Sequence, residues 1–211
     1  MGDYKELDNG KNSFVNRNNI SSTIDAIIDD KNPNLCGFVV FEDVKLNNLS
    51  KILNDNNVVF DNTLPLVMTK NHIYMDVRNS GILNIGNYHN LGKKLFVEAL
   101  NNIDNPTAIL NDKGSTVITV GIKDNHNNDI IVPIRLNERI RNTTIEANII
   151  QSIYGKRNFE SYLRNKLENV IYNKKSSTAL SNSSLGASSI SNIANPNENV
   201  NITSKPRQTN N

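Results

Sequence analysis

Residues 147–159, ANIIQSIYGKRNF, predict a strand that turns directly into a helix. The first half of the segment is apolar and rich in β-branched residues, which favours a strand. Side chains alternate along a strand, so Ser152 and Tyr154 are expected on one face. Gly155 permits a turn at the end of the strand, and Asn158 is a candidate N-cap of the helix.

Two cations, Lys156 and Arg157, follow the two hydroxyl groups in this segment. Hydroxyls, cations and a helix start at one strand end form an arrangement that can bind a phosphate. Arg135 adds positive charge on a neighbouring predicted strand. A plain strand–turn–helix corner with a solvated basic pair has the same pattern, so the segment alone leaves both interpretations open.

The composition limits the class of protein. The chain has 211 residues and a formal net charge of +2, which fits one ordinary domain with tails and excludes a strongly basic nucleic-acid protein. A single cysteine excludes an internal disulfide framework. The N-terminus lacks a signal-peptide pattern, and no apolar run approaches the roughly 20 residues that span a bilayer.

Hydrophobic periodicity changes from helical to strand-like along the chain. Helical spacing and short apolar runs predict helices and brief strands before Pro106, the best helix covering residues 91–103. After Pro106 the period becomes 2, and residues 115–122 and 130–136 predict an antiparallel hairpin. Pro133 cannot donate to a ladder, which predicts an edge strand. A further helix and a last short strand follow the quoted segment.

The sequence therefore predicts an α+β fold in which helices precede an antiparallel sheet of about four strands. We expect residues 1–19 to be a flexible lead and residues 20–175 to form one domain. Residues 176–211 are dominated by Ser, Asn and Thr, a composition that predicts a disordered tail.

The candidate chemistry is acid–base chemistry without a cofactor. His89, before the best helix, and His72, on a short helix, are candidate proton acceptors. A helix-entry residue explains His89 equally well, and a partly buried packing histidine explains His72 better than a catalytic role. Ser152 and Tyr154 are the candidate hydroxyl groups. The candidate phosphate-binding residues are Lys156, Arg157, Asn158 and Arg135. The sequence lacks the metal-binding and nucleotide-binding motifs, so we expect neither a metal nor another cofactor.

Four blocks of sequence together resemble the C-terminal domain of MuF-type phage minor head proteins, which also occurs in phage polyvalent proteins. The most specific parts are the His-x-Leu at 89–91, the Asn-Pro at 105–106 and the Ser-Ile-Tyr-Gly at 152–155. The resemblance covers residues 20–180, in the blocks 64–73 (LPLVMTKNHI), 89–110 (HNLGKKLFVEALNNIDNPTAIL), 115–137 (STVITVGIKDNHNNDIIVPIRLN) and 147–180 (ANIIQSIYGKRNFESYLRNKLENVIYNKKSSTAL).

The resemblance implies a phage-borne, toxin-like effector, because related domains are grouped with barnase, EndoU, colicin and RelE-like nucleases. It implies a metal-independent endoribonuclease, with His89, Ser152 and Tyr154 carried over as site residues and Lys156 and Asn158 beside them. RNA and an immunity protein are then the expected partners. The expected location is the host cytoplasm, reached directly or from the virion. The alternative is a non-catalytic module that binds a phage head protein or another protein.

Overall fold

The computed structural model describes residues 14–16, 19–29, 35–77 and 91–174. Most of the expected lead and all of the expected tail beyond residue 175 lie outside these ranges. The elements of the described part are, in chain order, β1 (Phe14–Asn16), α1 (Ile20–Ile28), β2 (Phe38–Val40), α2 (Asn47–Asp55), β3 (Leu66–Thr69), α3 (Lys70–Val77), α4 (Lys93–Asn101), β4 (Ala108–Asp112), β5 (Ser115–Lys123), β6 (Asp129–Arg139), β7 (Glu146–Ile150), β8 (Tyr154–Lys156), α5 (Phe159–Arg164), the 3-10 helix η2 (Leu167–Asn169) and β9 (Val170–Asn173).

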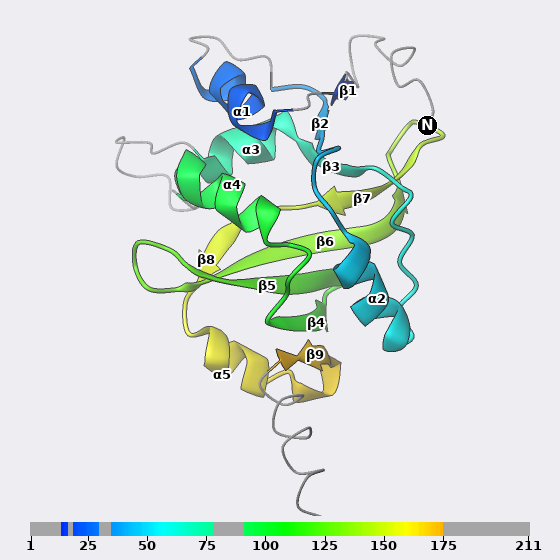
Figure 1. The fold of residues 1–211 in the computed structure, drawn as a ribbon, viewed down its shortest axis with the longest axis vertical. Coiled ribbons are helices and arrows are strands. Elements are labelled where there is room, and N and C mark those ends of the chain that lie inside the picture. The colour runs from blue at the N-terminus through cyan, green and yellow to red at the C-terminus, as the bar shows by residue number, and fades with distance from the viewer. Residues whose placement is uncertain (1–13, 17–18, 30–34, 78–90, 175–211) are drawn as a thin grey trace, which may run out of the picture.

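The expected α+β class is confirmed, but the sheet is larger than predicted and it is mixed. Its described strands number nine, in the order β1-β2-β3-β7-β6-β5-β4-β9, with β8 paired to β6 (Figure 1). The pairs β1–β2 and β3–β7 are parallel, and the others are antiparallel. The estimate of about four strands was too small because β3 joins β7 from about 80 residues away, and periodicity carries no signal of such a pairing.

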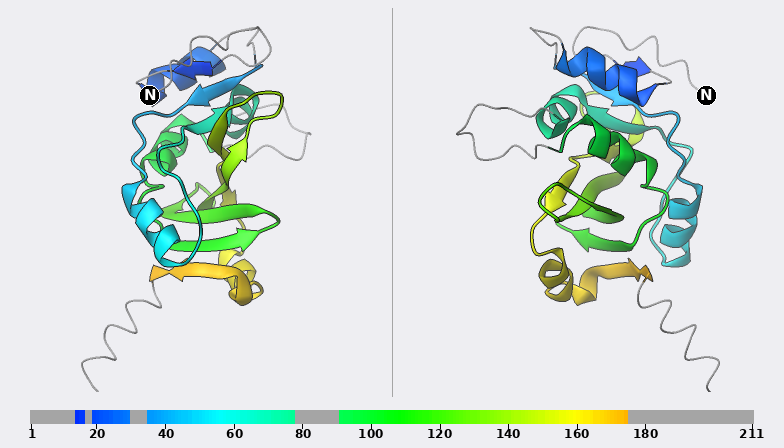
Figure 2. Two further views of the ribbon diagram at one scale, coloured as in Figure 1. Left: turned by 90° about the vertical axis from the view of Figure 1, so that its right-hand side faces the viewer. Right: turned by 60° about the vertical axis from the view of Figure 1, so that its left-hand side comes forward.

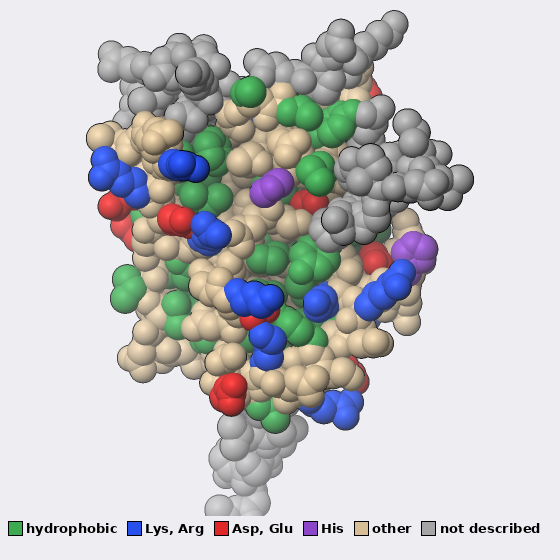
Figure 3. All heavy atoms as spheres, turned by 180° about the vertical axis from the view of Figure 1, so that it is seen from behind, with side chains coloured by type: hydrophobic (Ala, Val, Ile, Leu, Met, Phe, Trp, Pro, Cys, Tyr) green, Lys and Arg blue, Asp and Glu red, His purple; other side chains and the backbone are tan. Residues whose placement is uncertain are grey.

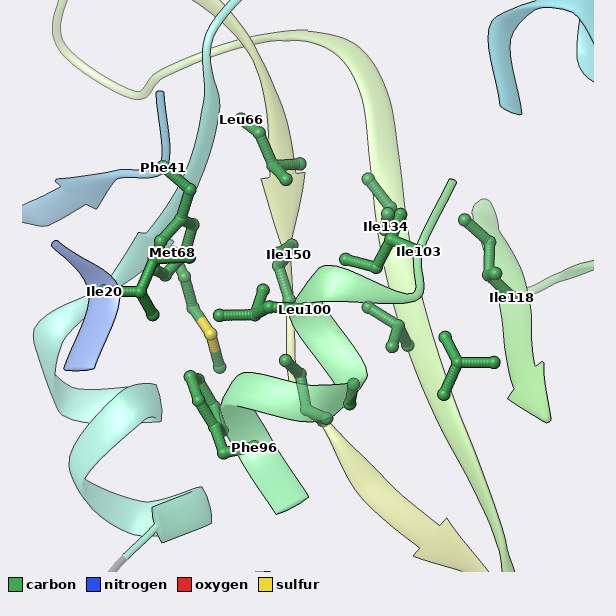
Figure 4. Packing of buried hydrophobic residues seen from close by; sticks show 14 of the residues in the cluster. Ile20, Phe41, Leu66, Met68, Phe96, Leu100, Ile103, Ile118, Ile134 and Ile150 are labelled. Atoms are coloured by element: carbon green, nitrogen blue, oxygen red, sulfur yellow. The ribbon is translucent and has the colours of Figure 1, made fainter. Parts of the chain in front are cut away.

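Helices cover the two faces of the sheet unequally. Helices α2 and α4 lie on one side of the sheet and α5 lies on the other (Figure 2). The main core fills the first side, where Phe96 and Leu100 of α4 pack against Met68, Ile134 and Ile150 (Figure 4). A smaller apolar cluster lies beneath α5, around Leu110, Val117, Ile131 and Phe159. The second face is therefore covered only in part.

Strand β6 is the centre of the fold, and its pairing explains an unexpected proline. One edge of β6 pairs with β5, and the other edge pairs with β7 and then with β8. Pro133 lies in this interior strand, so the expectation of an edge strand was wrong. The N–H and C=O of one residue in an antiparallel strand point to the same side. The Pro133 carbonyl accepts from Gln151 N at 2.9 Å, so the missing N–H faces the gap between β7 and β8, where no ladder partner is needed.

Candidate functional site

The gap between β7 and β8 is closed by a carboxylate from a distant helix. The segment that was expected to be one strand stops at Ile150 and resumes at Tyr154. Within the gap, Ser152 Oγ donates to the Asp76 carboxylate, lying 3.0 Å from each oxygen, and Ile153 N donates to Asp76 Oδ2 at 2.7 Å. Asp76 therefore replaces the ladder partners of Ser152 and Ile153, and the regular alternation expected for one continuous strand is interrupted between Ile150 and Tyr154.

Asp76 is an acid in an apolar position. It lies near the end of α3, is 2% exposed, and has the buried residues Ile73 and Val77 as neighbours on the helix. Burial raises the pKa of the Asp76 carboxyl from 3.8 to about 7, against the opposing effect of the hydrogen bonds from Ile153 and Ser152. A carboxyl of this kind exchanges its proton near neutral pH, which is the property that acid–base catalysis needs.

His72 lies one helical turn before Asp76 on α3, and it is half-buried. Its backbone N–H donates to Thr69 Oγ1 at 3.1 Å, so the Thr69 side chain caps the start of this helix. Its Nδ1 is buried and has no hydrogen-bond partner within the described residues. Burial lowers the pKa of the imidazole, so His72 is neutral at pH 7.

Tyr154 is half-buried on the sheet face that carries α5, where it packs against the cluster around Ile131 and Phe159. Burial raises the pKa of its phenol, and the charges of Asp112 and Asp76 raise it further. Tyr154 therefore lies within electrostatic reach of two carboxylates and stays protonated at neutral pH, so that it can donate a proton and cannot readily accept one.

A second polar cluster, formed by Asp112, Tyr162, Lys156 and Lys166, lies beside Tyr154 at the end of β4. Tyr162 Oη donates to Asp112 Oδ2 at 2.6 Å, and Lys166 Nζ forms an ion pair with Asp112. Lys156 Nζ lies 4.7 Å and Lys166 Nζ 5.4 Å from the centre of the Tyr162 ring. The hydrogen bonds from Lys166 and Tyr162 lower the pKa of the Asp112 carboxyl. This cluster combines two cations with a fixed negative charge.

One of the predicted phosphate-binding residues, Arg135, lies apart from the others. Arg135 is bound to Glu138 at 3.0 Å and lies beside the Gln151 amide. It is separated from Asp129, the β6 partner of Lys156, by six positions along the strand, roughly 20 Å at the usual rise per residue. It therefore lies apart from Lys156.

The other predicted site residues form the turn into α5. Arg157 and Asn158 are exposed. Asn158 occupies the N-cap position in the left-handed region, with φ 52°, and its side chain makes no capping bond. Gly155 is needed for a different reason from the one expected, because a Cβ there would lie 1.8 Å from Asp124 Oδ2. His89 lies outside the described residues.

Sequence reasoning missed Asp76, Asp112, Tyr162 and Lys166. Asp112 belongs to a turn sequence and Lys166 to a polar helix end, and neither position has a local signal. Asp76 did have one, since it takes the place of an apolar residue on the inner face of α3, and a buried acid is rare unless it has a specific partner.

Membrane spans, metal sites and similarity to known proteins also bear on what the site can do. Within the described ranges, no helix is long and apolar enough to cross a membrane, and no group of three or more His, Cys, Asp or Glu side chains could hold a metal ion. The family model of the phage MuF C-terminal domain matches residues 84–178, which confirms the resemblance over that range. The comparisons with curated proteins and with solved structures gave no match.

Proposed function

We propose that this chain is a phage effector that cleaves RNA by metal-independent acid–base catalysis where β7 gives way to β8. The observation that carries the proposal is the contact between the Ser152 hydroxyl and the Asp76 carboxylate, with Tyr154 two residues further along the chain. The match to a phage domain family supports the phage context. The proposed site keeps Ser152, Tyr154 and Lys156 from the sequence prediction and adds Asp76 as the base.

The proposed reaction is an internal transfer at phosphorus. The 2′-hydroxyl of the substrate gives its proton to Ser152 Oγ, whose own proton passes to Asp76. The 2′-oxygen then bonds to the adjacent phosphorus, and the bond from phosphorus to the 5′-oxygen breaks. Tyr154 donates its proton to that leaving oxygen, which leaves a 2′,3′-cyclic phosphate and a 5′-hydroxyl. Lys156 stabilises the negative charge that develops on the phosphoryl oxygens.

The two candidate histidines, His72 and His89, have supporting roles in the proposed mechanism. A neutral His72 one turn from Asp76 is a further proton acceptor near the base, and His89 remains a predicted member of the site. The substrate would meet the protein in the host cytoplasm, after expression there or delivery from the virion. A host that carries the gene would then need a protein that blocks the site.

The test is RNA cleavage by the purified full chain in excess EDTA. We expect the wild type to cut a single-stranded oligonucleotide and to leave cyclic phosphate ends. Tyr154→Phe and Ser152→Ala should each lower the rate by about 100-fold or more, the usual size of a general acid or base contribution. Tyr172→Phe is the matched control, because Tyr172 is a half-buried tyrosine of β9 that packs against the main core.

A lower rate is attributed to lost catalysis only if the variant has the same melting temperature as the wild type. Intact RNA after prolonged incubation with the wild type, together with normal growth of cells that express it, would refute the proposal. The chain would then be a non-catalytic module. Equal loss of rate in Tyr154→Phe and Tyr172→Phe would also remove Tyr154 from the mechanism.

A further inference from the structure

A pocket of about 580 Å³ lies between α5 and the strands β4, β5 and β9. Its volume is within the range of small-molecule sites. The apolar part of its lining is Ala108, Phe159 and Leu163, and Gly121 leaves part of the lining without a side chain. The Phe159 ring packs against Tyr162 at 5.9 Å between centroids, so the ring is held in place from one side.

The pocket contains a buried hydroxyl group that makes no hydrogen bond to the described part of the chain. Thr119 lines the pocket, is 2% exposed, and its Oγ1 has no partner within the described residues. An unpaired buried hydroxyl destabilises a fold, so such a group needs an explanation. Rotation about χ1 exchanges the methyl and hydroxyl positions, so Thr119 can offer a hydrogen bond to a ligand without breaking one.

Basic side chains surround the pocket. Lys123, Arg164 and Lys174 line it, together with the acids Asp129 and Glu160. Lys123 pairs with Asp129 at 2.7 Å, and Arg164 approaches Glu160 at 3.5 Å across an exposed surface. The exposed pair of Arg164 and Glu160 is weak and opens readily for a more highly charged group. Seen from behind (Figure 3), Lys and Arg side chains gather around exposed apolar side chains in the lower half of the molecule.

The strand register connects this pocket to the proposed catalytic residues. Thr119 of β5 is opposite Ile131 of β6, and Ile131 is opposite Tyr154 of β8. Residues opposite one another project to the same face, and two strand spacings are roughly 10 Å. Asp129, which lines the pocket, is likewise opposite Lys156. The lining of the pocket therefore lies roughly 5 to 10 Å across the sheet from Lys156 and Tyr154.

We propose that this pocket binds a nucleobase, with Phe159 against the face of the ring, Thr119 hydrogen-bonded to its edge and the cations around the pocket near the sugar-phosphate. Aromatic side chains and hydrogen bonds to base edges are the usual means of reading a single-stranded base. The choice of a nucleobase as the ring rests on the proposed function. The existence of the pocket and of the unpaired Thr119 hydroxyl does not depend on the proposed function.

The experiment titrates the full chain with each of the four nucleoside 5′-monophosphates and measures binding by calorimetry. Ribose 5-phosphate and inorganic phosphate serve as ligands without a base. We expect the affinity for at least one nucleotide to exceed the affinity for ribose 5-phosphate by about 10-fold or more. Thr119→Val should lower the affinity for that nucleotide by about 5- to 10-fold, because one hydrogen bond is lost. The melting temperature of the variant should equal or exceed that of the wild type. Thr116→Val is the control, because Thr116 is a buried threonine of the same strand that does not line the pocket.

Three results would overturn the inference. These are equal binding of nucleotides and ribose 5-phosphate, no binding of any nucleotide, and equal affinity in Thr119→Val and the wild type. The outcome is separable from that of the proposed function. Nucleotide binding without RNA cleavage refutes the catalysis and keeps the pocket, whereas cleavage that no nucleotide inhibits refutes the pocket and keeps the catalysis.

Discussion

Replacing Asp76 by asparagine tests the proposed base through stability before any activity is measured. The change preserves shape, and the amide can retain both contacts. Its oxygen accepts from Ile153 N–H, and its nitrogen donates to Ser152 Oγ, which replaces the present bonds at 2.7 and 3.0 Å. What Asp76→Asn removes is the buried ionisable proton. The variant therefore isolates the free energy of burying the negative charge.

The magnitude follows from the pKa of the carboxyl, which burial raises from 3.8 to about 7. As the pH rises through this window, the unfolded chain releases the Asp76 proton first, so the folded state loses stability relative to the unfolded state. A shift of about 3 units corresponds to a loss of about 4 kcal/mol by pH 8, with each unit equal to about 1.4 kcal/mol. Asp76→Asn has no such proton. The stability of Asp76→Asn relative to the wild type, measured as the difference in free energy of unfolding, should therefore rise by up to about 4 kcal/mol between pH 3.5 and pH 8.

The assay is urea unfolding followed by circular dichroism at four pH values between 3.5 and 8. Asp112→Asn is the control, because the hydrogen bonds from Lys166 and Tyr162 lower the pKa of Asp112. Its contribution to stability is present above pH 3.8 and is lost only below it, so the wild type should keep its advantage over Asp112→Asn throughout the upper range. A difference between Asp76→Asn and the wild type that does not change with pH would refute the argument. A gain in stability at pH 8 together with a loss of RNA cleavage would mark a residue kept for function.

Three further predictions follow from the geometry. The rate of RNA cleavage should rise as the pH passes about 7, where Asp76 ionises, and should not fall before pH 10 because the pKa of Tyr154 is raised; a rate profile over this range is the measurement. Asn158→Gly should be neutral or stabilising and Asn158→Ala should cost about 1 kcal/mol, because φ is 52° at this position, and thermal melts of the two variants would show the order. Gly121→Ala should lower the melting temperature by several degrees, because φ is +72° and the new Cβ would lie 2.8 Å from Thr107 Cγ2.

Local patterns predicted the elements well and their arrangement less well. The helical spacing before Pro106 and the alternation after it are properties of neighbouring residues, and α4, β5 and β6 appear where these patterns place them. The place of β3 in the sheet depends on its parallel contact with β7, far along the chain. Such a pairing leaves no mark in either segment, so the sequence supported a smaller sheet than the one that forms.

At the candidate site, too, local sequence patterns revealed single residues but not the contacts between distant segments. Tyr154 and Lys156 could be found because a hydroxyl and a cation follow an apolar strand. The division of that strand into β7 and β8 could not be found, because its cause is the carboxylate of Asp76 on another element. The structure places Arg135 apart from Lys156, and the sequence could not show this separation, since proximity to the same strand says nothing about which end of the strand a residue occupies.

The family match and the folded unit have different boundaries, and the difference affects the chemistry. The match begins at residue 84, yet the elements before it complete the same core, with Phe41, Leu49 and Met68 all buried in it. Strand β3 covers the edge of β7, and Asp76 closes the gap between β7 and β8. A fragment of residues 84–178 would expose that edge and leave the Ile153 N–H without its acceptor. Any reaction that depends on Asp76 and Ser152 together therefore belongs to the whole α+β unit rather than to the matched residues alone.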